Sequence, residues 1–347
     1  MKAEIIKMTE DSIDKNSIQR AGELLKAGEL VAFPTETVYG LGGNALNARA
    51  SKKIYAAKGR PSDNPLIVHI ADYEAIFDIV ASIPKKAQLL AREFWPGPLT
   101  MILPKSAKVP LETTGGLGSV AVRFPSHKIA RELIRAGGGY VAAPSANTSG
   151  RPSPTLASHV IEDLGEAIPM IIDGGQVGIG LESTIVDFTE EIPTVLRPGY
   201  ISLEMLKSLL GEVILDRGLL KSNEPPKAPG MKYRHYAPKA DLAIVEGDIP
   251  AVIAAINAYA ARASMEGKQV GIIGTEETIG QYPTGIVKSI GSRKDEESIA
   301  LHLYQVLREF DECRVSAIYS EAFYTPKMGQ AIMNRLLKAA GHKVIKV

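Results

Sequence analysis

The sequence predicts an α/β protein of two domains: a larger one with a twisted, mixed sheet, and a smaller, Rossmann-like one with a parallel sheet. Its 347 residues exceed what one small domain needs. Strand-like and helix-like segments mix without strict alternation up to about Leu210, but alternate regularly from Asp241 onward. The turn-rich stretch DRGLLKSNEPPKAPG between them is typical of a boundary. We therefore expect domains at residues 1–210 and 241–347, joined by a linker at 211–240.

The first domain is read from its hydrophobic periodicity. Apolar residues at helical spacing, ended by glycine or proline, predict helices at 17–28, 51–60, 73–84, 85–97 and 129–138. Short apolar runs predict strands at 29–35, 65–71, 99–104, 119–125, 139–147, 169–175, 183–188 and 194–199. This order favours a mixed sheet.

The second domain has a simpler order. Apolar runs predict strands at 241–247, 268–274 and 315–323, and the intervening periodicity predicts helices at 250–267, 298–313 and 329–341. No G-x-G-x-x-G follows one of these strands, so dinucleotide binding is not indicated.

Composition excludes several classes of protein. Hydrophobic residues make up 45% of the chain, enough for a sizeable core. Its 40 Lys and Arg against 39 Asp and Glu give a net charge of +1, so any polyanion site must be a local cluster. No apolar run reaches the about 18 residues of a membrane span, and the polar N-terminus lacks the apolar core of a signal peptide. A single cysteine, Cys313, suits the reducing cytoplasm, where we expect the protein, and we interpret it as structural.

The polar residues of the first domain gather in loops that follow apolar strands. In FPTETVYGLGG, Thr35, Thr37 and Tyr39 supply hydroxyls, and glycines let a ligand approach the backbone. The same stretch also fits a strand-to-loop turn with locally satisfied hydroxyls. The sequence leaves both interpretations open at this point.

A second loop, AAKGRPSDNPLIVHI, places Lys58 and Arg60 on either side of a glycine, with Asn64 and His69 soon after. Cations beside a polar amide suit a polyphosphate. The cations also suit the negative end of a helix dipole, and His69 alone fits a hydrogen-bonded core histidine.

Three further stretches carry polar residues. Arg123 lies in the apolar strand AVRFPSH, where its charge needs either an internal or a bound carboxylate. The loop AAPSANTSGRPSPT is rich in hydroxyl and amide groups, although a solvated surface loop has the same composition. ESTIVDF and LRPG add Ser183 and Arg197. The sequence contains no P-loop, H-E-x-x-H, C-x-x-C or G-x-S-x-G.

Together these stretches form a specific pattern. FPTETVYGLG, K-x-R…NPLIVH, PSAN-x-S-G-x-x-SPT, ESTIV and LRPG, in this order, closely resemble the threonylcarbamoyl-AMP synthase family with its YrdC domain. The resemblance covers residues 1 to about 210. The added APGMKYRHYAP and second domain resemble the long, two-domain form of the family.

The resemblance implies a reaction. Members of the family condense L-threonine, bicarbonate or CO2 and ATP to threonylcarbamoyl-AMP and release pyrophosphate. A partner system then transfers the threonylcarbamoyl group to the tRNA adenosine next to the anticodon, and a direct contact with tRNA stays open. The attacking group, a carbamate, comes from the substrate. The reaction therefore depends on positioning and charge stabilisation, without a protein nucleophile.

The resemblance also implies site residues. It assigns catalytic roles to Lys58 and Arg60. The implied ATP contacts are Arg60, Asn64, Ser119, Ser145, Ser153, Arg197, His235 and Tyr236. The implied L-threonine contacts are Thr37, His69, Arg123, Ala143 and Ser183, in which Arg123 suits the α-carboxylate because a guanidinium pairs with it bidentately. We expect Mg²⁺ to be held largely through ATP and not by protein ligands.

The proline-bounded stretch APGMKYRHYAP, Ala228–Pro238, carries Tyr233, Arg234, His235 and Tyr236. We expect it to act as both tether and active-site lid, because a carbamate and a mixed anhydride with AMP both hydrolyse readily and need protection from water. A docked linker without contact to substrate is the alternative.

Two other functions remain alternatives at this stage. A non-catalytic module for double-stranded RNA or tRNA would use the same Lys58 and Arg60 face, and its binding would weaken with salt. A carbamoyl-transfer domain, as in hydrogenase maturation proteins of the same fold, would come with zinc-finger and acylphosphatase-like segments, which this sequence lacks.

Overall fold

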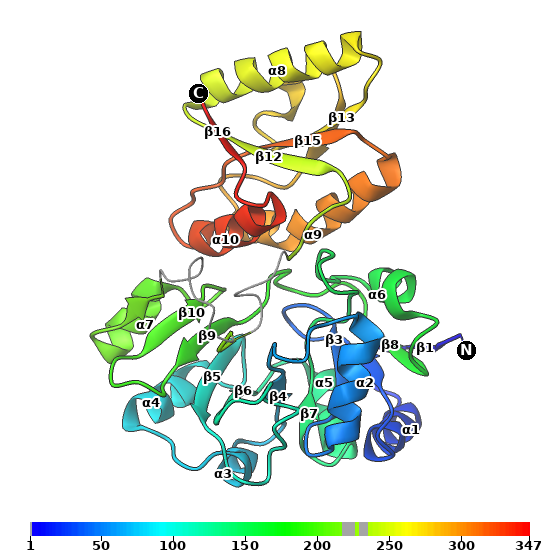
Figure 1. Cartoon of the computed structure of the whole chain (residues 1–347), viewed down its shortest axis with the longest axis vertical. Coiled ribbons are helices and arrows are strands. Elements are labelled where there is room, and N and C mark those ends of the chain that lie inside the picture. The colour runs from blue at the N-terminus through cyan, green and yellow to red at the C-terminus, as the bar shows by residue number, and fades with distance from the viewer. Residues whose placement is uncertain (1, 217–225, 229–234) are drawn as a thin grey trace. The chain divides into compact units, whose positions relative to one another are not determined.

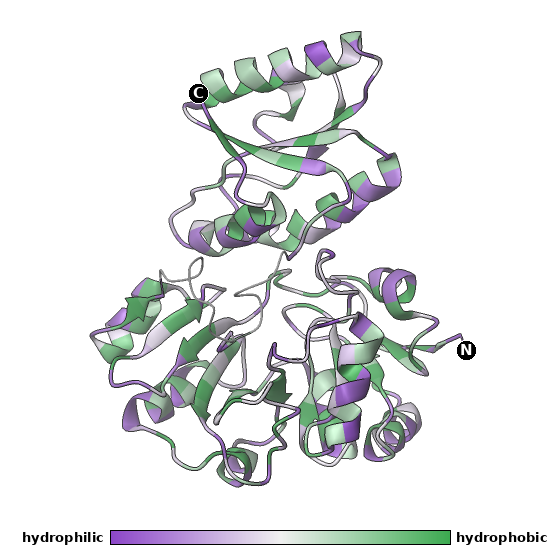
Figure 2. Ribbon diagram, viewed as in Figure 1, coloured by the Kyte–Doolittle hydropathy of each residue, from purple (hydrophilic) through white to green (hydrophobic). Residues whose placement is uncertain are grey.

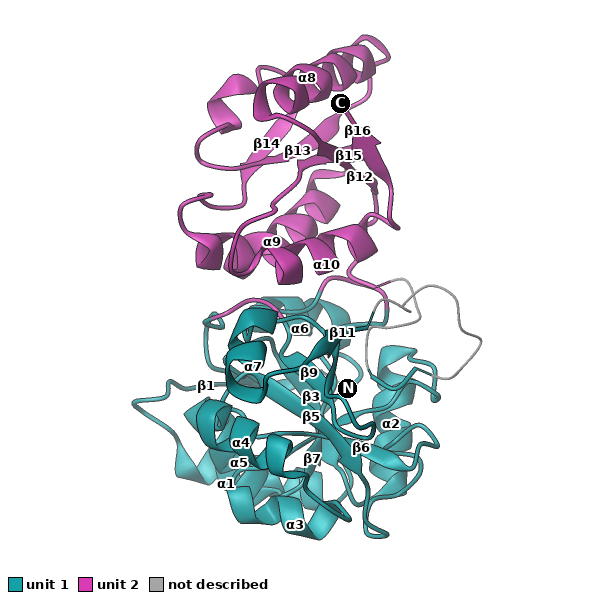
Figure 3. Cartoon of the chain, turned by 90° about the vertical axis from the view of Figure 1, so that its left-hand side faces the viewer, with its two compact units in different colours: residues 1–149, 153–178, 182–232 teal, residues 150–152, 179–181, 233–347 magenta. Residues whose placement is uncertain are grey.

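The computed structural model describes residues 2–216, 226–228 and 235–347, and they form two compact units (Figure 1, Figure 3). The first unit contains residues 1–149, 153–178 and 182–232, and the second contains residues 150–152, 179–181 and 233–347. Two short pieces of the loops that follow β7 and β8 are therefore grouped with the second unit, which the sequence pattern did not indicate.

A mixed sheet of eleven strands runs through the described part of the first unit in the order β1-β8-β2-β3-β7-β4-β6-β5-β9-β10-β11. Both parallel pairs, such as β4 with β6, and antiparallel pairs, such as β5 with β6, occur in it. The strands are β1 Glu4–Lys7, β2 Val31–Phe33, β3 Gly40–Asn44, β4 Ile67–His69, β5 Leu99–Pro104, β6 Ser119–Arg123, β7 Val141–Ala142, β8 Met170–Asp173, β9 Thr184–Asp187, β10 Thr194–Arg197 and β11 Ile214–Leu215.

Helices of the first unit pack their apolar stripes against this sheet. The helix α1, for example, buries Ile18, Ala21 and Leu25, and belongs with α5 to one hydrophobic cluster. Figure 2 shows the same division, with hydrophobic strands and hydrophilic outer helix faces. The helices are α1 Lys15–Lys26, α2 Ala48–Lys58, the 3-10 helix η1 Tyr73–Ala75, α3 Ile76–Ile79, α4 Lys85–Phe94, α5 Lys128–Ala136, α6 Ala157–Leu164 and α7 Leu203–Leu210.

The ends of α2 determine where the cation-rich loop begins. Asn47 caps the first turn by accepting the backbone N–H of Arg49 at 2.9 Å. Gly59 follows the last turn in the left-handed region at φ 59°, which glycine adopts without strain. The N–H of Arg60 then donates to the carbonyl of Tyr55 at 2.9 Å, so the chain turns sharply between Lys58 and Arg60.

The second unit is a parallel five-stranded sheet in the order β14-β13-β15-β12-β16. Figure 3 shows α8 on one face of this sheet and α9 and α10 on the other. The elements are β12 Asp241–Glu246, α8 Ile249–Met265, β13 Val270–Gly274, η2 Ile279–Gln281, β14 Ile286–Ser289, α9 Glu296–Cys313, β15 Ala317–Glu321, α10 Gly329–Ala339 and β16 Val344–Lys346.

The predicted fold class is confirmed: one large mixed sheet and a second, all-parallel one. The predicted helix at 73–84 is wrong over its second half, because only η1 and the single turn α3 form before Val80 becomes extended and bridges Lys105. The sequence pattern also missed β1, β3, α6, β11, β14 and β16. Within the described residues, no helix combines the length and apolar character needed to cross a bilayer.

Candidate active site

Five polar side chains, some predicted and some neighbouring, form a row across one end of adjacent strands in the first unit's sheet. His69 pairs with Arg123 across β4 and β6, and Thr100 pairs with Arg123 across β5 and β6. The Ser183 hydroxyl lies 2.8 Å from the Thr100 hydroxyl, and Arg197 donates from Nε and Nη2 to the Ser183 carbonyl and hydroxyl at 3.0 and 3.1 Å. Strands that run in opposite directions thus bring residues far apart in sequence to one place.

The side chains of this row point to one face of the sheet. Residues two apart on a strand point to the same face, so His69 lies on the face of Ile67, and Arg123 on that of Ala121. We call this the site face. Ala228 is fully buried in a cluster with the apolar side chains of the same face, namely Ile67, Ile102, Ala121, Ile185 and Leu196. The described start of the predicted lid therefore packs on the site face.

His69 is uncharged in this setting. Burial, together with the positive charge of Arg123, lowers the pKa of His69 to about 3. Its Nδ1 lies 3.1 Å from the carbonyl of Ile67. At neutral pH the imidazole therefore offers neutral hydrogen-bonding atoms and no charge to a ligand.

Arg123 has an internal partner. Its Nη2 lies 2.7 Å from Oε1 of Glu36, which lies on the loop between β2 and β3. The exposed fractions of the two side chains are only 5% and 13%. Of the two partners that the sequence allowed for this cation, the structure shows the internal carboxylate.

A second group of polar residues surrounds the C-terminal end of α2. The Lys58 ammonium, 2% exposed, donates to the carbonyl of Ser145 at 2.5 Å and to that of Asn147. The Ser145 hydroxyl in turn donates to Oδ1 of Asn147 at 2.5 Å. Lys58 therefore fixes the loop after β7 beside the end of α2.

Arg60 holds the loop that leads into β4. It donates from Nε to the carbonyl of Asn64 at 3.3 Å and from Nη2 to that of Pro65 at 3.2 Å. Asn64 is 1% exposed, and its side-chain oxygen has no hydrogen-bond partner among the described residues. Ser119 begins the neighbouring strand β6. These residues lie at the start of β4 and β6, at the opposite end from His69 and Arg123.

The two groups are separated by the length of one short strand. β4 has three residues, which at about 3.3 Å each span about 10 Å. Ala143 lies beside the middle of this span, since its N–H donates to the Ile67 carbonyl at 2.9 Å. An elongated ligand lying along β4 and β6 can therefore contact the cation-rich end with one part and the Arg123 row with another.

The remaining predicted residues take separate places. Thr37 is fully buried, and its hydroxyl lies 2.9 Å from that of Thr35. Ser153 is also fully buried and donates to Glu182 at 2.6 Å. His235 and Tyr236 belong to the second unit, where the Tyr236 ring lies 5.2 Å from that of Tyr304. Their predicted contact with ATP stays a prediction. Tyr233 and Arg234 of the predicted lid lie outside the described residues.

Two carboxylates were missed by the sequence analysis. Glu36 stands between the two threonines of PTET, and Glu182 opens ESTIV. A signal for the first existed, because Arg123 in an apolar strand requires a carboxylate. Sequence alone could not say which of the chain's acidic residues folds back to it.

Comparison with known families covers nearly the whole chain. The Sua5/YciO/YrdC family model, described as "Telomere recombination", matches residues 23–199. A second model, the C-terminal domain of threonylcarbamoyl-AMP synthase, matches residues 201–341.

Individual relatives agree. The chain is 50% identical to the threonylcarbamoyl-AMP synthase of Bacillus subtilis over 336 residues, with 96% of each chain covered. It is 48% identical to that of Pyrococcus abyssi over 344 residues, with 99% of each covered. The crystal structure of P. abyssi Sua5 complexed with L-threonine has a TM-score of 0.94 at 47% identity and covers 99% of this chain and 100% of that one.

Proposed function

The chain belongs to the threonylcarbamoyl-AMP synthase family in its two-domain form, and on that basis we propose that it condenses L-threonine, bicarbonate and ATP to threonylcarbamoyl-AMP, releasing pyrophosphate. In class it is a nucleotidyltransferase. The observation that carries the proposal is the full-length match, at about half identity, to relatives named for this activity.

The chemistry has two stages. The threonine amine becomes a carbamate, with loss of a proton when it takes up CO2 and with loss of water when it takes up bicarbonate. A carbamate oxygen then attacks the α-phosphorus of ATP, and the bond to the β-phosphate oxygen breaks, so pyrophosphate leaves with its electron pair. Because the substrate supplies the nucleophile, the protein's task is positioning and charge stabilisation.

We assign the nucleotide to the cation-rich end of the site face, and propose that its phosphates extend from Lys58 and Arg60 toward Arg197 in the Arg123 row. Lys58, Arg60 and Arg197 are the proposed phosphate partners, and all three are buried at 9% exposure or less, where charge interactions act more strongly than in water. The further proposed ATP contacts are Asn64, Ser119, Ser145, Ser153, His235 and Tyr236. The partnerless side-chain oxygen of Asn64 supports this assignment, because a buried acceptor gains from a ligand donor.

L-Threonine is assigned to the other end of the span. Arg123 is the proposed partner of its α-carboxylate, and Thr37, His69, Ala143 and Ser183 complete the pocket. A neutral His69 fits this role, since its pKa of about 3 leaves it free to hydrogen-bond the substrate hydroxyl without charge. A site that hydrogen-bonds a hydroxyl rejects analogues that lack one.

Mg²⁺ enters as part of the substrate, bound to the ATP phosphates, where it offsets their negative charge. Among the described residues, no three His, Cys, Asp or Glu side chains cluster so as to hold a metal. We propose that the ion takes its ligands mainly from nucleotide and water.

The product is an activated acyl group. We infer that a transferase acting on tRNA consumes it before water does, because a mixed anhydride with AMP hydrolyses readily. We accordingly infer a functional link to the machinery that threonylcarbamoylates the adenosine next to the anticodon, in the cytoplasm. Residues Ala228–Pro238 are proposed to shield the intermediate, supported by the packing of Ala228 on the site face.

Pyrophosphate release tests the function. Purified protein mixed with Mg·ATP, bicarbonate and L-threonine should release pyrophosphate, and omission of either threonine or bicarbonate should abolish the release. Release that continues at the same rate without threonine contradicts the proposal and indicates a generic ATPase. Salt-sensitive RNA binding without any release favours a binding module instead.

A further inference from the structure

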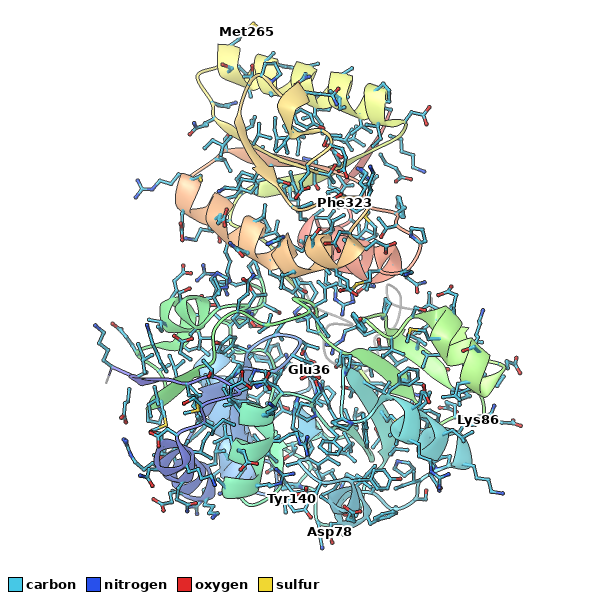
Figure 4. All side chains as sticks on the ribbon, turned by 180° about the vertical axis from the view of Figure 1, so that it is seen from behind. Glu36, Asp78, Lys86, Tyr140, Met265 and Phe323 are labelled. Atoms are coloured by element: carbon cyan, nitrogen blue, oxygen red, sulfur yellow. The ribbon has the colours of Figure 1, made fainter. Side chains whose placement is uncertain are left out.

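The buried ion pair of Glu36 and Arg123 indicates how the amino acid is recognised. This inference rests on the proposed function. Glu36, labelled in Figure 4, lies in the first unit on the loop between β2 and β3, next to Thr37 of the proposed threonine pocket. Arg123 ends β6 in the row on the site face. No role for Glu36 followed from the sequence pattern.

The pair is close but incompletely hydrogen-bonded. Nη2 of Arg123 and Oε1 of Glu36 approach to 2.7 Å, yet no hydrogen bond of good geometry joins them. Both carboxylate oxygens of Glu36, and Nε and Nη2 of Arg123, are buried without a hydrogen-bond partner among the described residues. Buried charged groups normally have their hydrogen bonds satisfied, because leaving them unmade is costly. The Glu36 carboxylate can therefore accept, and the Arg123 guanidinium can donate, further hydrogen bonds at neighbouring positions.

Two histidines lie near the pair of Glu36 and Arg123. His127, at the start of α5, interacts electrostatically with Glu36, Arg123 and Glu10, and burial is the main cause that lowers its pKa. His69 is neutral on the adjacent strand. The strongest charges at this place are thus one cation and one anion side by side.

An α-amino acid presents the complementary pattern. Its carboxylate and ammonium groups are attached to the same carbon atom, so they lie as close together as Arg123 and Glu36 do. We propose that Glu36 binds the α-ammonium group of the amino acid while Arg123 binds its carboxylate. In this proposal the ammonium and carboxylate groups of the amino acid replace the contact between the two side chains.

This arrangement has a consequence for specificity. Carbamate formation requires an amino group, which must lose its ammonium proton before the nitrogen attacks. A carboxylate that accepts hydrogen bonds from an ammonium group selects substrates that have such a group. A ligand with only a carboxylate gains Arg123 but must bury Glu36 without its partner, which opposes binding. Glu36 thus favours the binding of ligands that carry an amino group, before the reaction starts.

The experiment compares two ligands in two proteins. L-Threonine and (R)-3-hydroxybutanoate differ only in the amine, and isothermal titration calorimetry measures their affinities without any reaction. The wild-type protein should prefer threonine by about tenfold or more, as a hydrogen bond to a charged group is worth. In Glu36→Gln, threonine should bind about tenfold or more weaker, while 3-hydroxybutanoate should bind equally well or tighter, so the preference disappears.

Glu10→Gln is the matched control. Glu10 is also a carboxylate beside His127, 3.6 Å from its Nδ1, but it is more exposed and does not contact Arg123. This variant should keep the wild-type preference. A Glu36→Gln protein that keeps the preference, or that loses affinity for both ligands by the same factor, overturns the inference.

A second readout does not need a variant. A crystal structure of the wild-type protein with L-threonine should place the amine nitrogen about 2.7–3.2 Å from a Glu36 oxygen. An amine directed away from Glu36 overturns the inference, even if Glu36→Gln fails to fold. Wild-type protein that binds neither ligand contradicts the proposed function itself, whereas a preference that survives Glu36→Gln contradicts only this inference.

Discussion

Each unit of the protein buries a glutamate beside an arginine. The two glutamates differ in whether their carboxylate oxygens accept hydrogen bonds. Glu321, fully buried at the end of β15 in the second unit, accepts from Thr278 and Tyr282 on one oxygen at 2.5 and 2.7 Å, and from Arg293 on the other at 2.5 Å. Arg293 also lies over the ring of Phe323, labelled in Figure 4, at 5.4 Å. Glu36 in the first unit has neither oxygen hydrogen-bonded.

The difference separates a structural ion pair from a functional one. A carboxylate with both oxygens bonded by its own chain stabilises the fold and has little left for a ligand. A buried pair with unused donors and acceptors is a cost to stability that ligand binding can offset. We therefore expect substitutions in the second unit's pair to change stability, and substitutions around the first unit's pair to change binding and turnover.

The largest expected effect is on the stability of the second unit. Glu321→Ala leaves the buried Tyr282 and the partly buried Arg293 without their shared acceptor, and should lower the free energy of unfolding by about 3–5 kcal/mol. Urea unfolding followed by circular dichroism measures the change. Glu276→Ala, at an exposed position two residues after β13, should change it by less than about 0.5 kcal/mol. If both variants lower the free energy of unfolding by the same small amount, the pair of Glu321 and Arg293 is not a structural ion pair.

Arg60→Ala should produce the next largest effect, this time on turnover. Loss of one stabilising cation should reduce kcat by about 10²-fold or more, as measured by pyrophosphate release. Arg49→Ala on the neighbouring helix α2 removes an exposed cation of the same charge and should leave kcat within about twofold. If Arg60→Ala loses activity only in proportion to the fraction of protein that is unfolded, Arg60 has a structural role, as Arg293 has in the second unit.

Serine in place of threonine probes the other end of the site. Serine keeps the hydroxyl and the zwitterion but lacks the methyl group, and one such group changes transition-state binding by about 1–3 kcal/mol. The ratio of kcat/KM for threonine over serine should therefore be about 10 to 200. Equal values would mean that no apolar contact surrounds the methyl group.

The smallest effect is a pH dependence of stability from His69. Its pKa of about 3 in the folded protein lies below the ordinary 6.5, so below pH 6.5 the unfolded chain binds a proton that the folded one does not. Stability contributed by neutral His69 is complete above pH 6.5 and is lost as pH falls toward 3, by at most about 1.4 kcal/mol per pH unit.

His69→Asn should remove this part of the slope, as urea unfolding between pH 7 and 5 would show. His342→Asn is the control, since His342 is exposed and has φ 62°, a conformation that asparagine tolerates. An unchanged slope in His69→Asn would mean that His69 is protonated in the folded state.

Much of the fold could be predicted from the sequence, because long apolar periodicities such as that of α9 leave little choice. Short elements could not: β3 is rich in glycine, and its pairing with β2 depends on tertiary contacts. The helix expected at 73–84 also failed because of a tertiary contact, since Val80 is extended and bridges Lys105, while Ile76, Ile79 and Val80 are buried in the irregular segment that forms. Glu36 illustrates the limit for the site. The sequence predicted that Arg123 needs a carboxylate, but the partner is 87 residues away and only the folded chain brings it close.

The origin of the carbonyl carbon tests the central claim most directly. Protein incubated with Mg·ATP, L-threonine and carbon-13 bicarbonate should form an adenylate that mass spectrometry identifies as threonylcarbamoyl-AMP carrying the label, and only when threonine is present. An adenylate that lacks the label, or pyrophosphate released with no threonine-dependent adenylate, would contradict the account.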